Sequence, residues 1–126
     1  MEKTKHLQTE IDKRKPIWNA ISEFYLDTEL QDSDYEQILK IFLESNLSIT
    51  QLKAIDLYEV FPVLKGNIIT VAGEWNSFDE NWLNESSTKA YLKRDNKFYR
   101  FKIKIYNMFF QVLRKEHWKE IENRIS

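Results

Sequence analysis

Carboxylates are the side chains in this sequence that gather densely enough to do chemistry. One acidic cluster falls within residues 27–36, and a second falls within residues 74–80 beside a tryptophan. Paired carboxylates can act as general acid and base, and several together can hold a cation. The spacing of a calcium-binding EF-hand and its central glycine are missing, however, and no pair stands out as catalytic. We therefore predict no metal site and no catalytic carboxylate.

The residue types that other kinds of catalysis need are scarce in this chain. It contains no cysteine and only two histidines, His6 and His117, which lie near opposite ends of the sequence. A Ser-His-Asp triad or a two-histidine metal site therefore lacks its usual components. Two glycines in 126 residues cannot form the phosphate-binding loop of a Walker or Rossmann motif. The sequence predicts a protein that is not an enzyme and needs no cofactor.

Contact with a partner is a second use for the acidic clusters. Asp34 and Glu36 fall in the first turn of an expected helix, where the helix dipole favours acids, so solvated helix caps are the simplest interpretation. Asp27 and Glu29 instead fall at an expected helix C-terminus and oppose its dipole, which points to a role outside helix stability. Trp75 has the surroundings of an interface anchor, although tryptophans lie more often in a core. The candidate partner-binding residues are Asp27, Glu29, Asp32, Asp34, Glu74, Trp75, Asp79 and Glu80.

Charge is sorted along the chain. Residues 16–86 hold thirteen acidic and three basic side chains, whereas residues 87–126 hold eleven basic and four acidic ones. A surface rich in one sign attracts the other sign and speeds encounter. Basic and aromatic residues alternate near the C-terminus, but the isoelectric point of about 6.1 is low for a nucleic-acid-binding domain. Pairing with the acidic middle of the chain is the simpler use of these basic residues.

Composition indicates one helical domain. With 42 % apolar residues, a chain of 126 residues can bury a core, and two glycines and two prolines are too few for an all-β fold. We expect an all-α bundle of four to six helices over residues 15–126, after a polar tail at residues 1–14. No apolar leader and no apolar stretch near the ~20 residues of a membrane span are visible. A cytoplasmic protein without membrane contact is therefore expected.

Local signals place the helices. Pro16 suits the first position of a helix that begins near Lys15. Serines begin capping boxes at residues 33–36, 48–51 and 77–80. Asn46 suits a left-handed position after a helix, and Pro62 predicts a break or a new turn after the helix that precedes it.

Four residues are expected to be structural. Trp18 widens the apolar face of the first helix. Glu59 lies in an apolar neighbourhood and needs a partner, for which we expect a base of the C-terminal third. Gly66 and Gly73 bracket an apolar run, and we predict a short irregular segment or helical turns over residues 66–73, because a lone strand would be unstable.

The last third allows two interpretations. Residues 98–106 alternate like a strand, but a helical stripe continues for longer. We predict a helix, with the stripe facing the core; its members are Phe98, Phe101, Ile105, Met108 and Val112. No internal repeat is expected anywhere in the chain.

Three segments resemble a family of small bacterial proteins. They are Pro16–Leu30, Glu59–Val63 and Ala72–Asp79, which carry in order the pattern W-x-A-[IL]-S, LDTEL, EV-x-PV and AGEW-x-x-F. Such proteins are in turn similar to the immunity half of bacterial toxin–immunity pairs, including those of contact-dependent growth inhibition. The resemblance covers about residues 15–83 and brings no catalytic residues with it.

The resemblance implies an immunity protein that binds and neutralises a cognate toxin domain. Many toxin domains are basic nucleases, so an acidic surface would both steer binding and cover a phosphate-binding site. The alternative is a non-catalytic protein-interaction module, or a homodimer that joins acidic and basic faces, in another bacterial pathway. Either form is expected to be a monomer or homodimer when free.

Overall fold

The computed structural model describes residues 2–25, 30–69, 79–110 and 112–125, and the regular elements in these ranges are all helical. The predicted all-α fold is confirmed. In chain order the elements are α1 (Glu2–Ser22), the 3-10 turn η1 (Glu23–Tyr25), α2 (Asp32–Ser45), α3 (Ile49–Ile55), the π-helical turn η2 (Asp56–Val60), α4 (Phe61–Ile69), α5 (Glu80–Lys93), α6 (Lys97–Phe110) and α7 (Val112–Ile125).

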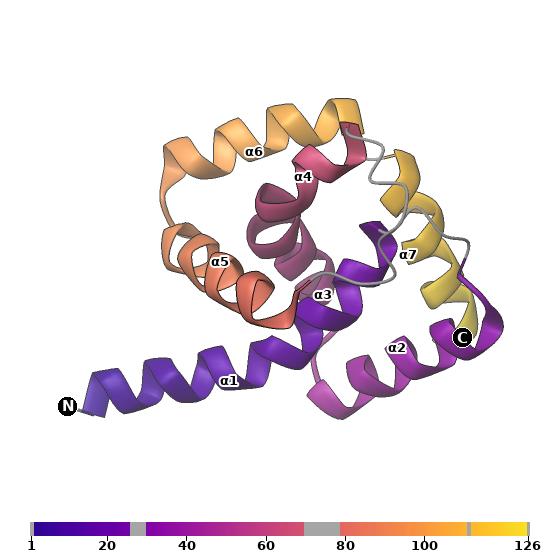
Figure 1. Ribbon diagram of the computed structural model, residues 1–126, viewed down its shortest axis with the longest axis horizontal. Helices are drawn as coiled ribbons and strands as arrows, with labels where there is room; N and C mark the ends of the chain where they lie inside the picture. The colour runs from indigo at the N-terminus through magenta and orange to yellow at the C-terminus, as the bar shows by residue number, and fades with distance from the viewer. Residues whose placement is uncertain (1, 26–29, 70–78, 111, 126) are drawn as a thin grey trace.

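A continuous helical rod formed by α3, η2 and α4 lies in the middle of the molecule, with the other helices around it (Figure 1). Its π-helical turn packs against α1, α5 and α6. Within the turn, the Phe61 N–H donates to the Asp56 carbonyl five residues earlier, which is the hydrogen bond of a π-helix. Of the two alternatives predicted at Pro62, a break does not occur, because the chain continues as helix through this residue, but the π-helical turn ends just before it.

The carbonyl that Pro62 would deprive of a donor is satisfied from another helix. Proline has no N–H, so in a helix the carbonyl four residues earlier, that of Tyr58, loses its partner. The Tyr99 hydroxyl of α6 donates to this Tyr58 carbonyl at 2.9 Å. The rod therefore continues through a proline because α6 supplies the missing hydrogen bond.

The predicted start of the first helix is also wrong. We expected a polar tail followed by a helix from Lys15, but α1 begins at Glu2 and contains Pro16 in its interior. Residues 2–14 are rich in Glu, Lys and Gln, which are good helix formers, and Ile11 among them is buried. The first part of α1 extends beyond the other helices at the lower left of Figure 1.

Two predicted helix ends are confirmed, the end of α2 and the start of α3. Ser48 and Gln51 form a reciprocal capping box, and Asn46 has the left-handed φ of 62°. Elsewhere the cap lies at a different residue: Gln31 precedes α2, and the Asp79 carboxylate caps α5. Of residues 66–73, for which we expected irregular structure or helical turns, residues 66–69 belong to α4 and residues 70–73 lie outside the described residues.

Aromatic stacking joins α7 to the first half of the chain. Trp118 stacks on Phe42 of α2 with ring centroids 5.4 Å apart, and its edge meets Phe24 of η1 at 5.3 Å. His117, also on α7, stacks on Phe24 with ring centroids 5.1 Å apart. Its Nδ1 lies 2.7 Å from the Tyr35 hydroxyl. These contacts place a titratable ring where α2, η1 and α7 meet.

His117 should make stability fall in mild acid. Burial lowers the pKa of His117 from its usual 6.5, against a smaller opposite effect of Glu116. The unfolded chain therefore binds a proton first as the pH falls below about 6.5, and the folded state loses stability until its own lowered pKa is reached. Urea unfolding at pH 7.5 and 5.5 should show a larger loss for the wild type than for His117→Gln.

His6→Gln is the matched control, since His6 is exposed on α1. It should lose as much stability between the two pH values as the wild type does. Equal losses in the wild type and in His117→Gln would contradict the assignment to His117.

Candidate functional site

Asp56, in the π-helical turn, is a buried carboxylate that accepts three hydrogen bonds from two other elements, α7 and η1. The Arg114 Nε donates to its Oδ2 at 3.1 Å and the Trp118 Nε1 donates to the same oxygen at 2.7 Å, both from α7. The Tyr25 hydroxyl of η1 donates to Oδ1, and burial raises the pKa of Tyr25 well above its usual value. Both oxygens of Asp56 are thus occupied by protein donors.

Glu59, three residues further along the same turn, is the second buried carboxylate. Its Oε1 accepts from the Trp18 Nε1 at 2.9 Å and lies 3.5 Å from the Arg14 Nη1, both on α1. Burial raises the pKa of Glu59, while Arg14, the Trp18 N–H and Arg94 act in the opposite direction. The expected structural pairing of Glu59 is present, but its direct partner is a base of α1 and not of the C-terminal third.

The two centres are built alike. In each, one buried acid of η2 is held by an arginine and by a tryptophan N–H that follows the arginine by four residues. Arg-Lys-x-x-Trp-x-x-Ile occurs at residues 14–21 and again at residues 114–121, and the last isoleucine of each segment is buried. This short shared pattern is the sequence signal that could have revealed both centres.

The π-helical turn places the two acids on different sides of the rod. In a regular α-helix, side chains three residues apart share a face. A wider turn separates them, so that Asp56 meets α7 while Glu59 meets α1. The turn therefore allows one short segment to bind the first and the last helix at once.

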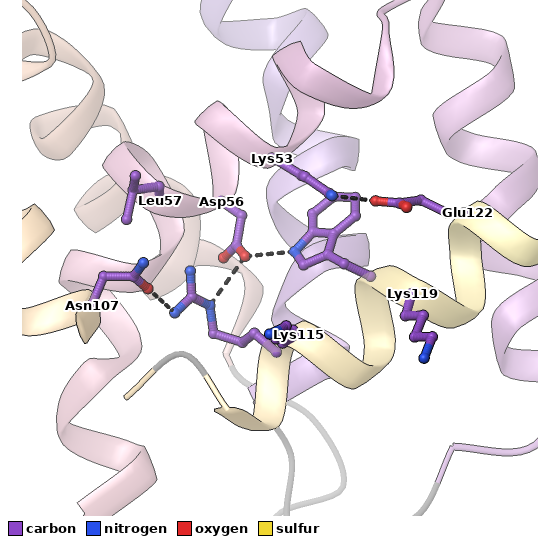
Figure 2. Close-up of a pocket in the computed structure, with 9 residues that line it drawn as sticks. Lys53, Asp56, Leu57, Asn107, Lys115, Lys119 and Glu122 are labelled. Carbon is purple, nitrogen blue, oxygen red and sulfur yellow. Dashed lines mark hydrogen bonds and ion pairs between the residues drawn. The ribbon is translucent and has the colours of Figure 1, made fainter. Parts of the chain in front are cut away.

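An open cleft of about 530 Å³ lies over the Asp56 centre. Figure 2 shows Asp56 at its wall, Asn107 to one side and the ion pair of Lys53 with Glu122 at its rim. The Arg114 Nη1 donates to the Asn107 Oδ1 at 2.6 Å, so α6 is also tied to this wall. The cleft is lined by Lys53, Asp56, Leu57, Asn107, Arg114, Lys115, Trp118, Lys119 and Glu122.

The side chains that line this cleft carry a net positive charge, and one of its two acids, Asp56, has a structural role. The lining contains four basic and two acidic side chains, and both acids are engaged in ion pairs. Because Asp56 already accepts three hydrogen bonds, it links helices to one another and has no oxygen left without a protein donor. Within the described residues, no group of three or more His, Asp or Glu side chains could hold a metal ion.

Half of the predicted partner-binding residues are described, and most of these have roles within the chain. Asp32 pairs with Arg124 at 2.6 Å, Asp34 accepts from the Gln31 N–H at 2.8 Å, and Asp79 accepts from the Trp82 N–H at 3.1 Å. Glu80 is exposed in the first turn of α5. The other predicted residues, Asp27, Glu29, Glu74 and Trp75, lie outside the described residues, as does Gly73.

Helix α6 presents an apolar face to solvent. Residues 98–106 are helical, as predicted, but the prediction that the stripe faces the core is wrong for its first four members, and the fifth, Val112, belongs to α7. The core side of α6 carries Ile103, which is buried, with Tyr99 and Tyr106 packed against the core. The exposed stripe, here called the α6 seam, consists of Phe98 (86 % exposed), Phe101 (66 %), Ile105 (41 %) and Met108 (72 %).

The physical reason for this reversal is that α6 is apolar on both sides. Periodicity identifies a stripe but does not say which of two stripes is buried. The Tyr58 carbonyl needs a donor, and the Tyr99 hydroxyl that provides it holds this rotation of α6 together with buried Ile103. The seam then faces away from the rod.

A family model described as a domain of unknown function, DUF7079, matches residues 12–124. The chain belongs to the DUF7079 family. The DUF7079 match includes both arginine–tryptophan segments, the two buried acids and the whole of α6. Neither a curated protein nor a solved structure matches the chain significantly. Among the described helices, none has the length and apolar character needed to cross a membrane.

Removing either buried acid should destabilise the fold strongly. Glu59→Ala and Asp56→Ala should each lower the free energy of unfolding by about 3 kcal/mol, because a largely buried arginine loses its counterion. Glu122→Ala is the matched control: it removes the partner of Lys53 at a half-exposed pair and should cost less than about 1 kcal/mol. Urea unfolding measures all three, and a loss below about 0.5 kcal/mol for both buried acids would contradict their structural role.

Proposed function

We propose that the chain is a non-catalytic protein-binding domain and that the α6 seam contacts its partner. The observation that carries this proposal is the exposure of four large apolar side chains on one face of one helix. Single exposed apolar residues are common on soluble proteins, but a contiguous row of them is typical of an interaction surface. Phenylalanine and methionine are also enriched in the cores of protein interfaces.

The way the seam is held supports the same proposal. Tyr99, Ile103 and Asn107 attach the opposite side of α6 to the rod and to Arg114. A partner would therefore meet a face that is already positioned, and little ordering entropy would be lost on binding. The Asp56 and Glu59 centres add to this support, because they stabilise the helical rod on which α6 packs.

A narrower form of the proposal is that the partner is a bacterial toxin domain, which the chain neutralises by binding. Its support is the resemblance of residues 15–83 to proteins similar to toxin-immunity proteins. The alternative form is an interaction module with a partner of another kind. The gene beside the one that encodes this chain distinguishes the two, since a toxin gene favours the first and a metabolic operon the second.

Disruption of the seam should abolish partner binding without unfolding the domain. Phe101→Glu combined with Met108→Glu changes two exposed residues, so the unfolding midpoint should stay near that of the wild type. When the chain is co-expressed with the toxic product of the neighbouring gene, the wild type should restore growth and co-elute with that product. The double variant should do neither.

Leu43→Glu is the matched control, because Leu43 is an exposed apolar residue (61 %) on α2. It should protect and bind like the wild type. Wild-type binding by the seam variant would show that α6 is not the interface, and a non-toxic neighbouring product would rule out the toxin form.

The acidic clusters remain a competing prediction for the interface. If they hold a basic toxin, Asp27→Lys with Glu29→Lys, or Glu74→Lys with Asp79→Lys, should weaken association by about 2–5 kcal/mol where the lost pairs are buried. Pairs at the rim would mainly slow association and flatten its salt dependence. Association rates at low salt, measured for both double variants and the seam variant, show which face binds.

A further inference from the structure

We infer that the α6 seam binds one amphipathic helix whose flanks are acidic, an inference that rests on the proposal that the seam is a protein-binding face. The first observation is the spacing of the seam. Its residues fall at positions 98, 101, 105 and 108, which alternate steps of three and four residues. This is the spacing of the a and d positions of a coiled-coil heptad, the arrangement by which one helix packs along another.

The second observation is that the seam is free along its length in the described part of the chain. The four exposed fractions show that none of the described helices covers it. In Figure 1, α6 lies at the upper edge of the molecule, with no other helix drawn beyond it. At 1.5 Å per residue the seam extends for about 15 Å, which is the length of about one and a half heptads of a partner helix.

The third observation is the charge beside the seam. Lys97 and Lys104 lie on one flank and Lys102 on the other, at positions that correspond to g and e of the heptad. All three lysines are exposed, and none forms an ion pair with the described residues. No acidic residue occurs between Lys97 and Phe110. Residues at e and g select the partner of a coiled coil, so these lysines favour glutamate or aspartate opposite them.

The same lysines disfavour a second copy of the chain as the occupant. In a parallel pair of α6 helices, g residues meet e residues, and in an antiparallel pair g meets g and e meets e. A parallel pair would bring Lys97 of one copy beside Lys102 of the other, and an antiparallel pair would bring Lys97 beside Lys104. Like charges at these positions are destabilising, so the partner is a different helix.

A lipid surface fits the seam less well than a helix does. Helices that lie in a membrane interface have a broad apolar face. The seam instead is a row one or two side chains wide, and its other side is fixed to the protein core by Tyr99 and Ile103. A narrow row between lysines is the geometry of a helix–helix contact.

Two synthetic peptides of about three heptads test the inference. Both have leucine at a and d; one has glutamate at every e and g position, and the other has lysine there. Fluorescence anisotropy at 50 mM salt should show that the intact protein binds the glutamate peptide more tightly, by about tenfold or more. The preference should shrink at 300 mM salt, because the charges are exposed and screened.

A charge-swapped variant makes the test specific to α6. Lys97→Glu with Lys102→Glu and Lys104→Glu should reverse the preference, so that the lysine peptide binds more tightly. Lys40→Glu with Lys89→Glu and Lys119→Glu, on exposed positions of other helices, changes the net charge equally and should keep the original preference. Phe101→Glu with Met108→Glu should lose binding of both peptides.

Three outcomes would overturn the inference. Equal affinity for both peptides, or an unchanged preference in the charge-swapped variant, would show that the flanking lysines do not select the partner, while leaving the seam as a protein-binding face. Binding of neither peptide, together with seam-dependent binding to anionic phospholipid vesicles, would assign the seam to a lipid surface. Sedimentation showing a dimer of the wild type that the seam variant lacks would assign it to a second copy.

Discussion

Two carboxylates buried in one helical turn impose the constraint on which this structure depends. An isolated ionised acid in a protein interior costs several kcal/mol, and two acids three residues apart also repel each other. Asp56 and Glu59 are tolerated because each receives an arginine and a tryptophan N–H from a different helix. The first and last helices of the chain must therefore both contact η2. The need of two buried acids for partners thus brings the two ends of the chain together.

The same turn decides how α6 is rotated. Pro62 leaves the Tyr58 carbonyl without its helical donor, and a buried carbonyl without a partner is costly. The Tyr99 hydroxyl supplies that hydrogen bond only when its side of α6 faces the rod. Rotating α6 by half a turn would bury Phe98, Phe101 and Met108, but it would remove Tyr99 from Tyr58. The seam is thus exposed because α6 buries its other face, where Ile103, Tyr99 and Tyr106 pack on the core and the Tyr99 hydroxyl bonds the Tyr58 carbonyl.

Local features of this structure could be predicted from the sequence, and pairings across the chain could not. The capping box of Ser48 and the left-handed Asn46 depend on residues within one turn, so their patterns were sufficient. The need of Glu59 for a partner also followed from its apolar neighbours. Its partner did not, because Arg14 lies 45 residues away and many bases compete for the role. For α6 the period predicted a helix, but two apolar stripes share that period, and only contacts with distant segments, such as that of Tyr99 with the Tyr58 carbonyl, distinguish them.

The charge order of the sequence and the charge balance of the folded chain favour different faces for a partner. The sequence draws attention to the acids, yet Asp32, Asp34 and Asp79 are engaged with Arg124 or with backbone N–H groups at helix starts. Such acids are already partly compensated before any partner arrives. The lysines beside the α6 seam have no acid opposite them among the described residues, and they flank the largest exposed apolar row there. Charge selects a partner most effectively where it surrounds apolar area that binding can bury, so the basic side of the molecule has the stronger physical claim.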